Sequence, residues 1–464
     1  MKRVLVILFF LSTSLSFAQD RNYAQELVNF LLQNRCIEAR ELNMEHEGKI
    51  IENNSEVKLF YTALMGRFFN KPDTFSYYIK DFISNHNYQM QLGRATYDYY
   101  WKLLRIYADN QQFEAGMELC DEIIDLYKRN PFNIDQELVK NEINFAEKIK
   151  STLKERAIHE PLIKIERNHS EDNIIKLYEN DYIRFDAKYN GAQIETLFDT
   201  GCNHYFFTYK NIADKIGVKI INKNQDSTLL FNGVQTKAYE GIIDSIDLKS
   251  VKLYNIPVLV IFDTPAVNLN DASFGDNERA KIEKTFTDKQ IVMGIPAMKL
   301  IGKIEFDWNK NTISFPQTRE YKSNNNFSNI FFIDNDLFLN LKINGLNYSG
   351  YLDSGSNVFI NMRYSFYENN KNYIEVANSI AKKQSTYFSI SWTGNRFNMP
   401  YEIVTNSNIY FKGESVNHDI EEVLIVDNST FFNSLDGFVG IRFLKRLSTG
   451  ITIDFDNMVI ERKN

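Results

Sequence analysis

Two short motifs in this sequence place a carboxylic acid in a loop after an apolar strand. They read Asp199-Thr200-Gly201 and Asp353-Ser354-Gly355. A carboxyl group can give or take a proton during a reaction, so a pair of them could supply both a general acid and a general base. A single motif of this kind is also an ordinary turn, because Asp and Gly favour turns. The sequence context of the two motifs therefore decides whether they indicate a catalytic pair or two ordinary turns.

The two motifs lie in matching contexts. Residues 184–191 and 338–345 align without a gap at an offset of 154, both segments end in Asn-Gly, and each Gly comes eight residues before the Asp of its motif. Farther on, Gly294 and Gly440 each follow two apolar residues, at an offset of 146. Residues 304–308 and 451–455 then predict a closing hairpin in each half. An internal duplication explains all four pairings.

With this duplication the sequence resembles the aspartic peptidases of the pepsin and retropepsin group, as a single chain with two homologous lobes. The resemblance covers roughly residues 165–464 and rests on the paired Asp-Thr/Ser-Gly motifs. It implies two small β-barrel-like lobes, each of which delivers one Asp from a Gly-bounded loop. Asp199 and Asp353 would then form the catalytic dyad of an endopeptidase. Gly294 and Gly440 would lie in the segments that brace the two loops.

The implied dyad has a clear physical rationale. Two ionised carboxylates about 3 Å apart would repel by about 5 kcal/mol at an effective dielectric constant near 20, so one of them stays protonated. The protonated group can serve as the acid and the ionised group as the base that activates water. The hydroxyls of Thr200 and Ser354 can hydrogen-bond to the opposite loop. Gly201 and Gly355 leave space beside the carboxylates.

Each half also contains a strand-turn-strand segment that could overhang the cleft as a flap. The first segment is centred on Asn232 and Gly233, and the second on Thr393 and Gly394. A flap would exclude water and help to position the substrate. Ordinary surface hairpins are the alternative interpretation of both segments.

Two further alternatives stay open from the sequence. Cys202 stands where the family usually has a small residue, and with His204 it could be read as a nucleophile and its base. The chain could also be a catalytically inactive relative that uses the peptidase fold and its helices to bind peptides and partner proteins. The Asp199–Asp353 dyad explains the sequence around Cys202, so a mechanism with a thiol nucleophile is not needed.

The elements that position these residues fall into two regions. From residue 19 to residue 160, apolar residues follow helical spacing, with breaks at Asn70-Lys71-Pro72 and at Asp109-Asn110. This pattern predicts an α-helical domain of TPR-like hairpins with a protein partner, or else a spacer or pro-region. Beyond it, period-two alternation and Asn-Gly turns predict an all-β region. We divide that region into a first lobe, residues 161–320, and a second lobe, residues 321–464, joined by a polar linker at residues 317–328.

Composition narrows the function further. The net charge is −7 and no Lys/Arg-rich block occurs, which argues against a nucleic-acid partner. The six His and three Cys lack zinc-site spacing, so neither a metal nor another cofactor is expected. Cys36 and Cys120 could form a disulfide after export, although spacing cannot test the pairing.

The first residues predict an exported protein. Lys2 and Arg3 precede a short apolar stretch at residues 4–11, and small residues lead to Ala18. This pattern is typical of a signal peptide, residues 1–18, that is cleaved after Ala18. Its apolar core is too short to span a membrane, so we expect a periplasmic or secreted protein. The resemblance to aspartic peptidases implies that its substrate is a peptide or protein.

Overall fold

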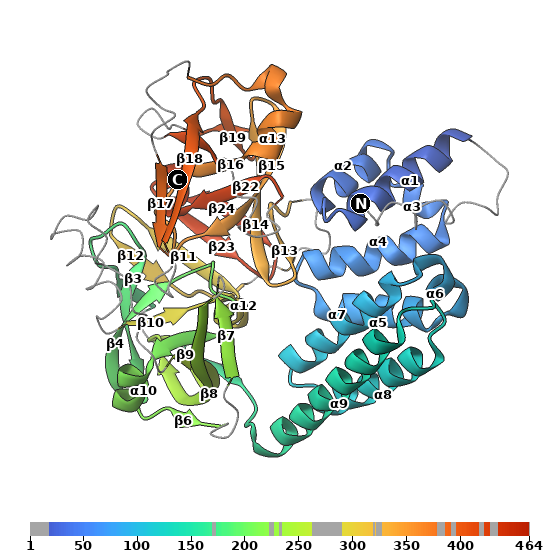
Figure 1. The fold of residues 1–464 in the computed structure, drawn as a ribbon. Coiled ribbons are helices and arrows are strands. Elements are labelled where there is room, and N and C mark those ends of the chain that lie inside the picture. Colours follow the sequence, from blue (N-terminus) through green and yellow to red (C-terminus); the bar gives the residue numbers. More distant parts are fainter. Residues whose placement is uncertain are drawn as a thin grey trace. The chain divides into compact units, whose positions relative to one another are not determined.

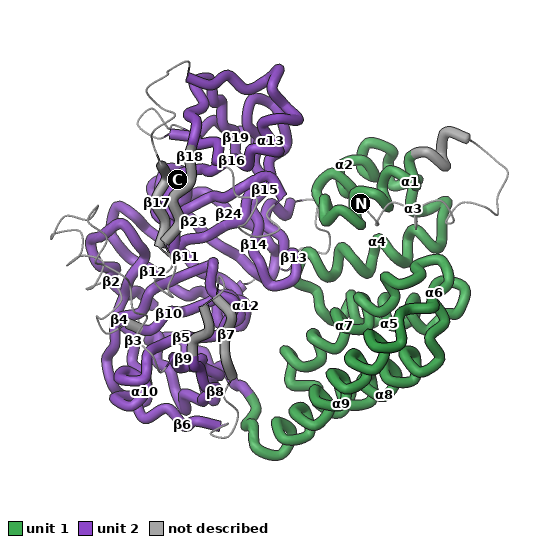
Figure 2. The backbone as a smooth tube through the Cα atoms, viewed as in Figure 1, with its two compact units in different colours: residues 1–162 green, residues 163–464 purple. Residues whose placement is uncertain are grey.

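The computed structural model describes residues 18–168, 173–221, 227–231, 234–261, 290–318, 321, 327–377, 386–390, 396–416, 422–426 and 435–463. The chain divides into two compact units, residues 1–162 and residues 163–464 (Figure 2). The first unit is helical, whereas strands dominate the second (Figure 1). The prediction of a helical region followed by a β-rich region is therefore confirmed at this level.

Successive helices joined by short loops make up the described part of the first unit. They are α1 (Ala18–Leu32), α2 (Cys36–Glu45), α3 (Lys49–Glu52), α4 (Ser55–Phe68), α5 (Pro72–Ser84), α6 (His86–Leu92), α7 (Ala95–Asp109), α8 (Phe113–Arg129) and α9 (Gln136–His159). Both predicted breaks are confirmed, because α4 ends before Asn70 and α7 ends at Asp109.

Local signals explain where these helices begin and end. Pro72 starts α5. Backbone N–H groups in the first turn of a helix have no intrahelical acceptor, so the helix loses no hydrogen bond to a proline at this position. Asn130 ends α8 with φ 43°, a left-handed conformation that Asn tolerates well. Asp135 caps α9, because its side chain accepts hydrogen bonds from the N–H groups of Glu137 and Leu138.

Cys36 and Cys120 lie in the core of the helical unit. Both are buried free thiols, so the structure does not contain the disulfide that was considered from the sequence. Burial raises the pKa of the Cys120 thiol to about 11 and also raises that of Cys36. Both residues therefore behave as small apolar core residues.

Three sheets make up the described strands of the second unit. The first sheet contains β1 (Lys164–Arg167), β3 (Arg184–Tyr189), β4 (Ala192–Phe198), β5 (Phe206–Tyr209), β6 (Lys219–Ile220), β7 (Ser227–Phe231), β8 (Val234–Asp247), β9 (Val251–Ile261) and β10 (Gln290–Met293). The second contains β2 (Ile174–Lys176), β11 (Lys303–Asp307), β12 (Thr312–Ser314), β23 (Gly450–Asp454) and β24 (Val459–Lys463).

The third sheet contains β13 (Ile330–Ile333), β14 (Asp336–Ile343), β15 (Leu346–Asp353), β16 (Ile360–Arg363), β17 (Thr386–Ile390), β18 (Arg396–Ile403), β19 (Ile409–Phe411), β20 (Glu414–Ser415), β21 (Val423–Val426) and β22 (Gly437–Gly440). Short helices lie between the strands: α10 (Lys210–Ile216), α12 (Ile295–Ile301), α13 (Tyr364–Asn369), η2 (Lys371–Tyr373) and α14 (Ile441–Leu447).

Two tight turns set the register of the strands that lead to the motifs. At Asn190-Gly191, φ is 47° and 85°, and at Asn344-Gly345 it is 52° and 82°. Positive φ at both central residues is the requirement of a two-residue hairpin turn that matches strand twist. The turn at Asn190-Gly191, predicted from the sequence, is confirmed by the pairing of β3 with β4.

The same strand arrangement surrounds both motifs. In the first sheet β10 pairs parallel with β4 and antiparallel with β5. In the third sheet β22 pairs parallel with β15 and antiparallel with β16 (Figure 1). A short helix follows each of these inner strands, α12 after Gly294 and α14 after Gly440. Asp199 and Asp353 therefore come at the ends of equivalent strands.

The second sheet joins the two halves of this unit. Strand β11 pairs with β23 from Lys303↔Asp454 to Asp307↔Gly450, so the two closing hairpins form one continuous sheet. The sequence predicts one hairpin in each half but not the pairing of the two hairpins. Parts of the predicted linker at residues 317–328 lie outside the described residues.

Candidate active site

Asp199 and Asp353 occupy two loops with the same local geometry. The N–H of Gly201 donates to Asp199 Oδ1 at 2.8 Å, and the N–H of Gly355 donates to Asp353 Oδ1 at 2.9 Å. Asp199 is 3% exposed, whereas Asp353 is partly exposed. These backbone donors fix the orientation of both carboxyl groups.

A reciprocal network of hydrogen bonds ties the two loops together. Thr200 Oγ1 donates to the Leu352 carbonyl at 2.7 Å and accepts from the Ser354 N–H at 2.8 Å. Ser354 Oγ donates to the Phe198 carbonyl at 3.0 Å and accepts from the Thr200 N–H at 3.0 Å. Both hydroxyl side chains are fully buried. Thr200 and Ser354 therefore hold the loops at a fixed separation.

The glycines of the motifs allow each carboxyl group to reach the opposite loop. A methyl group added to Gly201 would lie 2.7 Å from Asp353 Oδ1, and one added to Gly355 would lie 2.6 Å from Asp199 Oδ1. The two aspartate side chains are also hydrogen-bonded to each other. The structure thus brings together all six motif residues.

The environment of Asp353 favours its protonated form. Burial raises the pKa of this carboxyl well above its usual range, and the charge of Asp199 and the hydrogen bond between the two side chains raise it further. The N–H groups of Gly355 and Ser356 oppose this rise only in part. The pair can therefore hold one proton between two oxygens.

Gly294 and Gly440 lie against the loops that follow the two aspartates. The Ile295 N–H donates to the Cys202 carbonyl at 2.9 Å, and the Ile441 N–H donates to the Ser356 carbonyl at 3.0 Å. A methyl group on Gly294 would collide with the Cys202 and His204 carbonyl oxygens, and one on Gly440 would collide with those of Ser356 and Val358. Both positions therefore require glycine for close backbone approach.

Substitution of either glycine by Ala should destabilise the β-rich unit. We expect Gly294→Ala and Gly440→Ala each to lower the free energy of unfolding by about 3 kcal/mol, because the added methyl group must displace backbone. Gly345→Ala is the matched comparison, since it has open space and should lose only about 1 kcal/mol through its positive φ. Chemical denaturation measures all three, and equal losses would contradict the bracing role.

Cys202 is not arranged as a nucleophile with His204. The Cys202 thiol contacts the backbone carbonyl of His204 at 3.8 Å. Burial and the charge of Asp199 raise the pKa of this thiol to about 12, so the reactive thiolate is disfavoured at neutral pH. The thiol instead packs against an apolar cluster that includes Leu197 and Val292.

The predicted flap residues Asn232, Gly233, Thr393 and Gly394 lie outside the described residues. The strands that flank them are described. Strand β7 pairs antiparallel with β8, and β17 pairs antiparallel with β18. Each half therefore has an antiparallel strand pair at the predicted flap position.

Two polar contacts between the loops and strands of the site were not predicted from the sequence. The Tyr351 hydroxyl donates to the Gly201 carbonyl at 3.2 Å. Asn203 Nδ2 donates to Asp336 Oδ1 at 2.9 Å. Tyr351 precedes Asp353 by two residues, so strand alternation could have placed its side chain on the same face.

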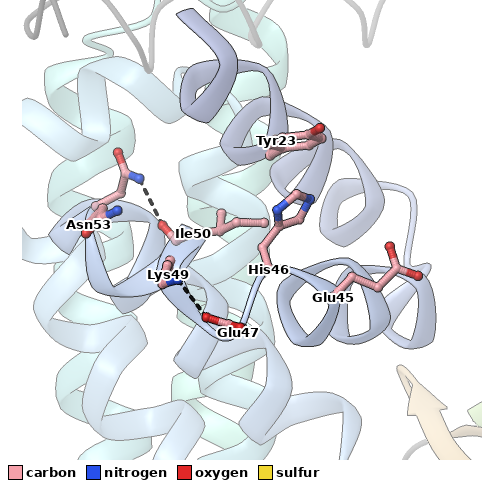
Figure 3. A pocket seen from close by; sticks show the side chains of 8 residues that line it. Tyr23, Glu45, His46, Glu47, Lys49, Ile50 and Asn53 are labelled. Carbon is pink, nitrogen blue, oxygen red and sulfur yellow. Dashed lines mark hydrogen bonds and ion pairs between the residues drawn. The ribbon is translucent and has the colours of Figure 1, made fainter. Parts of the chain in front are cut away.

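The helical unit has a separate open pocket (Figure 3). It is lined by Tyr23, Glu45, His46, Glu47, Lys49, Ile50, Asn53 and Asn54. The rings of Tyr23 and His46 lie 3.9 Å apart, and Lys49 forms an ion pair with Glu47 at 2.6 Å. None of the predicted site residues lines this pocket.

Two further features bear on ligands and membranes. Over the described ranges, no group of three or more His, Cys, Asp or Glu side chains is placed to hold a metal ion. Among the helices that the structure describes, none has both the length and the apolar character needed to cross a bilayer.

Comparison with known proteins places an aspartic protease-like region in this chain. Residues 185–280, which contain Asp199, match the sequence model of the family described as aspartyl protease. A solved retropepsin-like aspartic protease from Rickettsia conorii is 18% identical, with a TM-score of 0.21, and the match covers 32% of this chain and 98% of that one. A search of curated proteins finds no match. The family match supports a peptidase-like function for the region that contains Asp199.

Proposed function

We propose that this protein is an aspartic-type endopeptidase that hydrolyses peptide bonds with water activated between Asp199 and Asp353. The observation that carries the proposal is the hydrogen-bonded pair of carboxyl groups, whose loops are tied together by Thr200 and Ser354. The proposal includes the two-lobed architecture of the pepsin and retropepsin group for residues 163–464. The family match at residues 185–280 supports the assignment of an aspartic peptidase.

The mechanism uses the single proton of the pair. The raised pKa of Asp353 favours Asp353 as the acid, which leaves Asp199 as the ionised base. Asp199 takes a proton from water while the water oxygen attacks the peptide carbonyl carbon, and Asp353 protonates the carbonyl oxygen. A proton then passes from Asp199 to the amide nitrogen, the C–N bond breaks, and the remaining hydroxyl proton returns to Asp353.

An extended peptide fits this site best. Strand pairs such as β7 with β8 and β17 with β18 offer backbone groups that can pair with a substrate strand. The chemistry needs no cofactor. The prediction that the helical unit binds a protein partner stays a prediction.

Cleavage of an unfolded protein tests the proposal. The full chain is incubated with a reduced and alkylated protein from acidic to alkaline pH, and new termini are identified by mass spectrometry. We expect cleavage within the substrate chain that declines towards alkaline pH, because the shared proton is then lost. Binding of the substrate without cleavage at any pH would favour a scaffold protein instead.

The raised pKa of Asp353 also predicts how stability depends on pH. An Asp has a pKa of about 4 in the unfolded chain, and its pKa in the folded protein is higher. Its stabilising contribution is therefore fully present below about pH 4 and is lost as pH rises through the folded pKa. We expect the free energy of unfolding of the native protein, relative to Asp353→Asn, to fall over this window. A difference that stays constant with pH would contradict the raised pKa.

We further propose that the protein is exported and that residues 1–18 are removed. The basic residues at the start, the short apolar stretch and Ala18 support this. The mature protein should therefore begin at Gln19 when it is purified from the periplasm or medium of a bacterial host. Mass determination of the intact chain measures this, and an exported protein that retains Met1 would contradict it.

A further inference from the structure

Tyr182 lies just before β3, the strand that pairs with β4, and Asp199 directly follows β4. Arg184 pairs with Leu197 in the β3–β4 hairpin, and the carbonyl of Ile183 accepts a hydrogen bond from the N–H of the residue before Asp199. Continuing this register by one residue brings Tyr182 to the position facing Asp199.

Asp336 occupies the matching position in the third sheet. Phe338 pairs with Tyr351 in the β14–β15 hairpin. Asp336, the first residue of β14, lies two residues beyond this pair on one strand, and Asp353 lies two residues beyond it on the other. Asp336 and Tyr182 are 154 residues apart, which is the offset that relates Asp353 to Asp199.

The side chains at these two positions differ in chemistry. In the proposed dyad, the phenol of Tyr182 is the neighbour of Asp199. The carboxylate of Asp336 is the neighbour of Asp353. The duplication has therefore kept the dyad nearly symmetric while its two flanking positions have diverged. An extended substrate that crosses the dyad would meet a different side chain on each side of the cleaved bond.

Contacts between the two halves hold both residues near the dyad. Asp336 Oδ1 accepts a hydrogen bond from Asn203, two residues beyond Gly201, at 2.9 Å. Lys445 Nζ, on helix α14, donates to the Asp181 carbonyl at 2.9 Å and so anchors the residue before Tyr182. Asp336 and Tyr182 are both only partly buried, so a substrate side chain can reach them.

Electrostatic effects agree with this placement. The charges of Asp353, Asp336 and Asp199 all add to the rise that burial causes in the pKa of Tyr351. Burial raises the pKa of Tyr182, and Asp353 and Asp199 contribute to that rise. Asp336 thus adds a third acidic group on one side of the dyad.

We propose that the cleft selects peptides by charge: the subsite beside Asp336 takes a basic side chain, Lys or Arg, and the subsite beside Tyr182 takes an apolar or aromatic one. This inference rests on the proposed function, because it concerns the substrate of the same site. A carboxylate at a partly buried position favours a cation and disfavours an anion. A phenol ring favours apolar contact.

Peptide binding to an inactive variant tests the inference independently of cleavage. Asp353→Asn is combined with Asp336→Asn, which keeps an oxygen acceptor for Asn203 but removes the charge. A set of peptides with Lys, Glu or norleucine at each position is titrated by fluorescence anisotropy, and circular dichroism checks the fold. We expect Lys to bind about ten-fold more tightly than Glu at one position, and this preference to vanish with Asp336→Asn.

The matched control is Asp334→Asn, which removes a charge at an exposed position in the turn between β13 and β14, two residues before Asp336. Loss of the preference in this control as well would mean that net charge, not contact with Asp336, selects the peptide, and would overturn the inference. Equal affinity for Lys and Glu peptides at every position would also overturn it. Cleavage of the same peptides by the native chain is measured separately. A failure of the proposed peptidase activity can therefore be distinguished from a failure of the proposed charge preference. Tyr182→Ser should weaken the preference for norleucine over Lys and Glu at one peptide position, on the other side of the cleaved bond from the position that prefers Lys.

Discussion

Replacement of Asp353 by Asn is expected to reduce peptide hydrolysis by roughly three orders of magnitude or more while the fold survives. Asn keeps the size of the carboxyl group and can still accept the hydrogen bond from the Gly355 N–H. It cannot carry the proton that Asp353 shares with Asp199. Initial cleavage rates, measured by mass spectrometry on a fixed peptide, quantify the loss.

The companion variants show whether the two residues act as one unit. Asp199→Asn should cause a similar loss, and the double variant should be scarcely worse than either single one, because acid and base work together. Cys202→Ser is the control for a thiol mechanism and should keep activity. If Cys202→Ser abolished cleavage while Asp353→Asn left it intact, the assignment of the dyad would be wrong.

Thr200→Val should be the most damaging substitution outside the dyad. Valine has the shape of threonine but lacks its hydroxyl, so the Leu352 carbonyl and the Ser354 N–H would both lose their partner in a buried site. Each unsatisfied group costs about 1–3 kcal/mol, and we expect a total loss of about 3 kcal/mol in the free energy of unfolding. Because the network sets the separation of the loops, hydrolysis should fall by about two orders of magnitude as well.

Thr200→Ser provides the matched control for this substitution. It retains the hydroxyl and removes only a methyl group, so most of the stability and activity should remain. Chemical denaturation and cleavage rates are measured for both variants. A Thr200→Val protein with native stability and activity would show that the reciprocal hydrogen bonds do not hold the site together.

The parts of the fold that could be predicted from the sequence are those with local physical causes. The Asn190-Gly191 turn and the helix breaks before Pro72 and after Asp109 depend on which residues tolerate a given backbone conformation. The pairing of β11 with β23 has no such cause. It joins strands far apart in the chain whose apolar patterns would suit many partners, so only the packed structure reveals it.

The candidate site shows the same division. Its motif residues could be predicted because acid–base chemistry needs carboxyl groups and because the internal duplication repeats the motif at an offset of 154 residues. The contacts of Tyr351 with Gly201 and of Asn203 with Asp336 depend on how two sheets meet, which the sequence alone leaves open. The offset of 154 residues does relate Asp336 to Tyr182, although a sequence offset alone does not place either residue near the dyad.

The central claim is that Asp199 and Asp353 hold one proton between them, and infrared spectroscopy of the carboxyl groups tests it most directly. Near pH 6, exposed Asp and Glu side chains are ionised, so a protonated carboxyl band reports an acid with a raised pKa. Difference spectra between the native protein and Asp353→Asn or Asp199→Asn isolate the contribution of the pair. We predict a protonated carboxyl band in the native protein that Asp353→Asn removes and that Asp199→Asn shifts, because Asp353 stays buried in that variant but loses its carboxylate partner. A band that persists unchanged in both variants would contradict the shared proton.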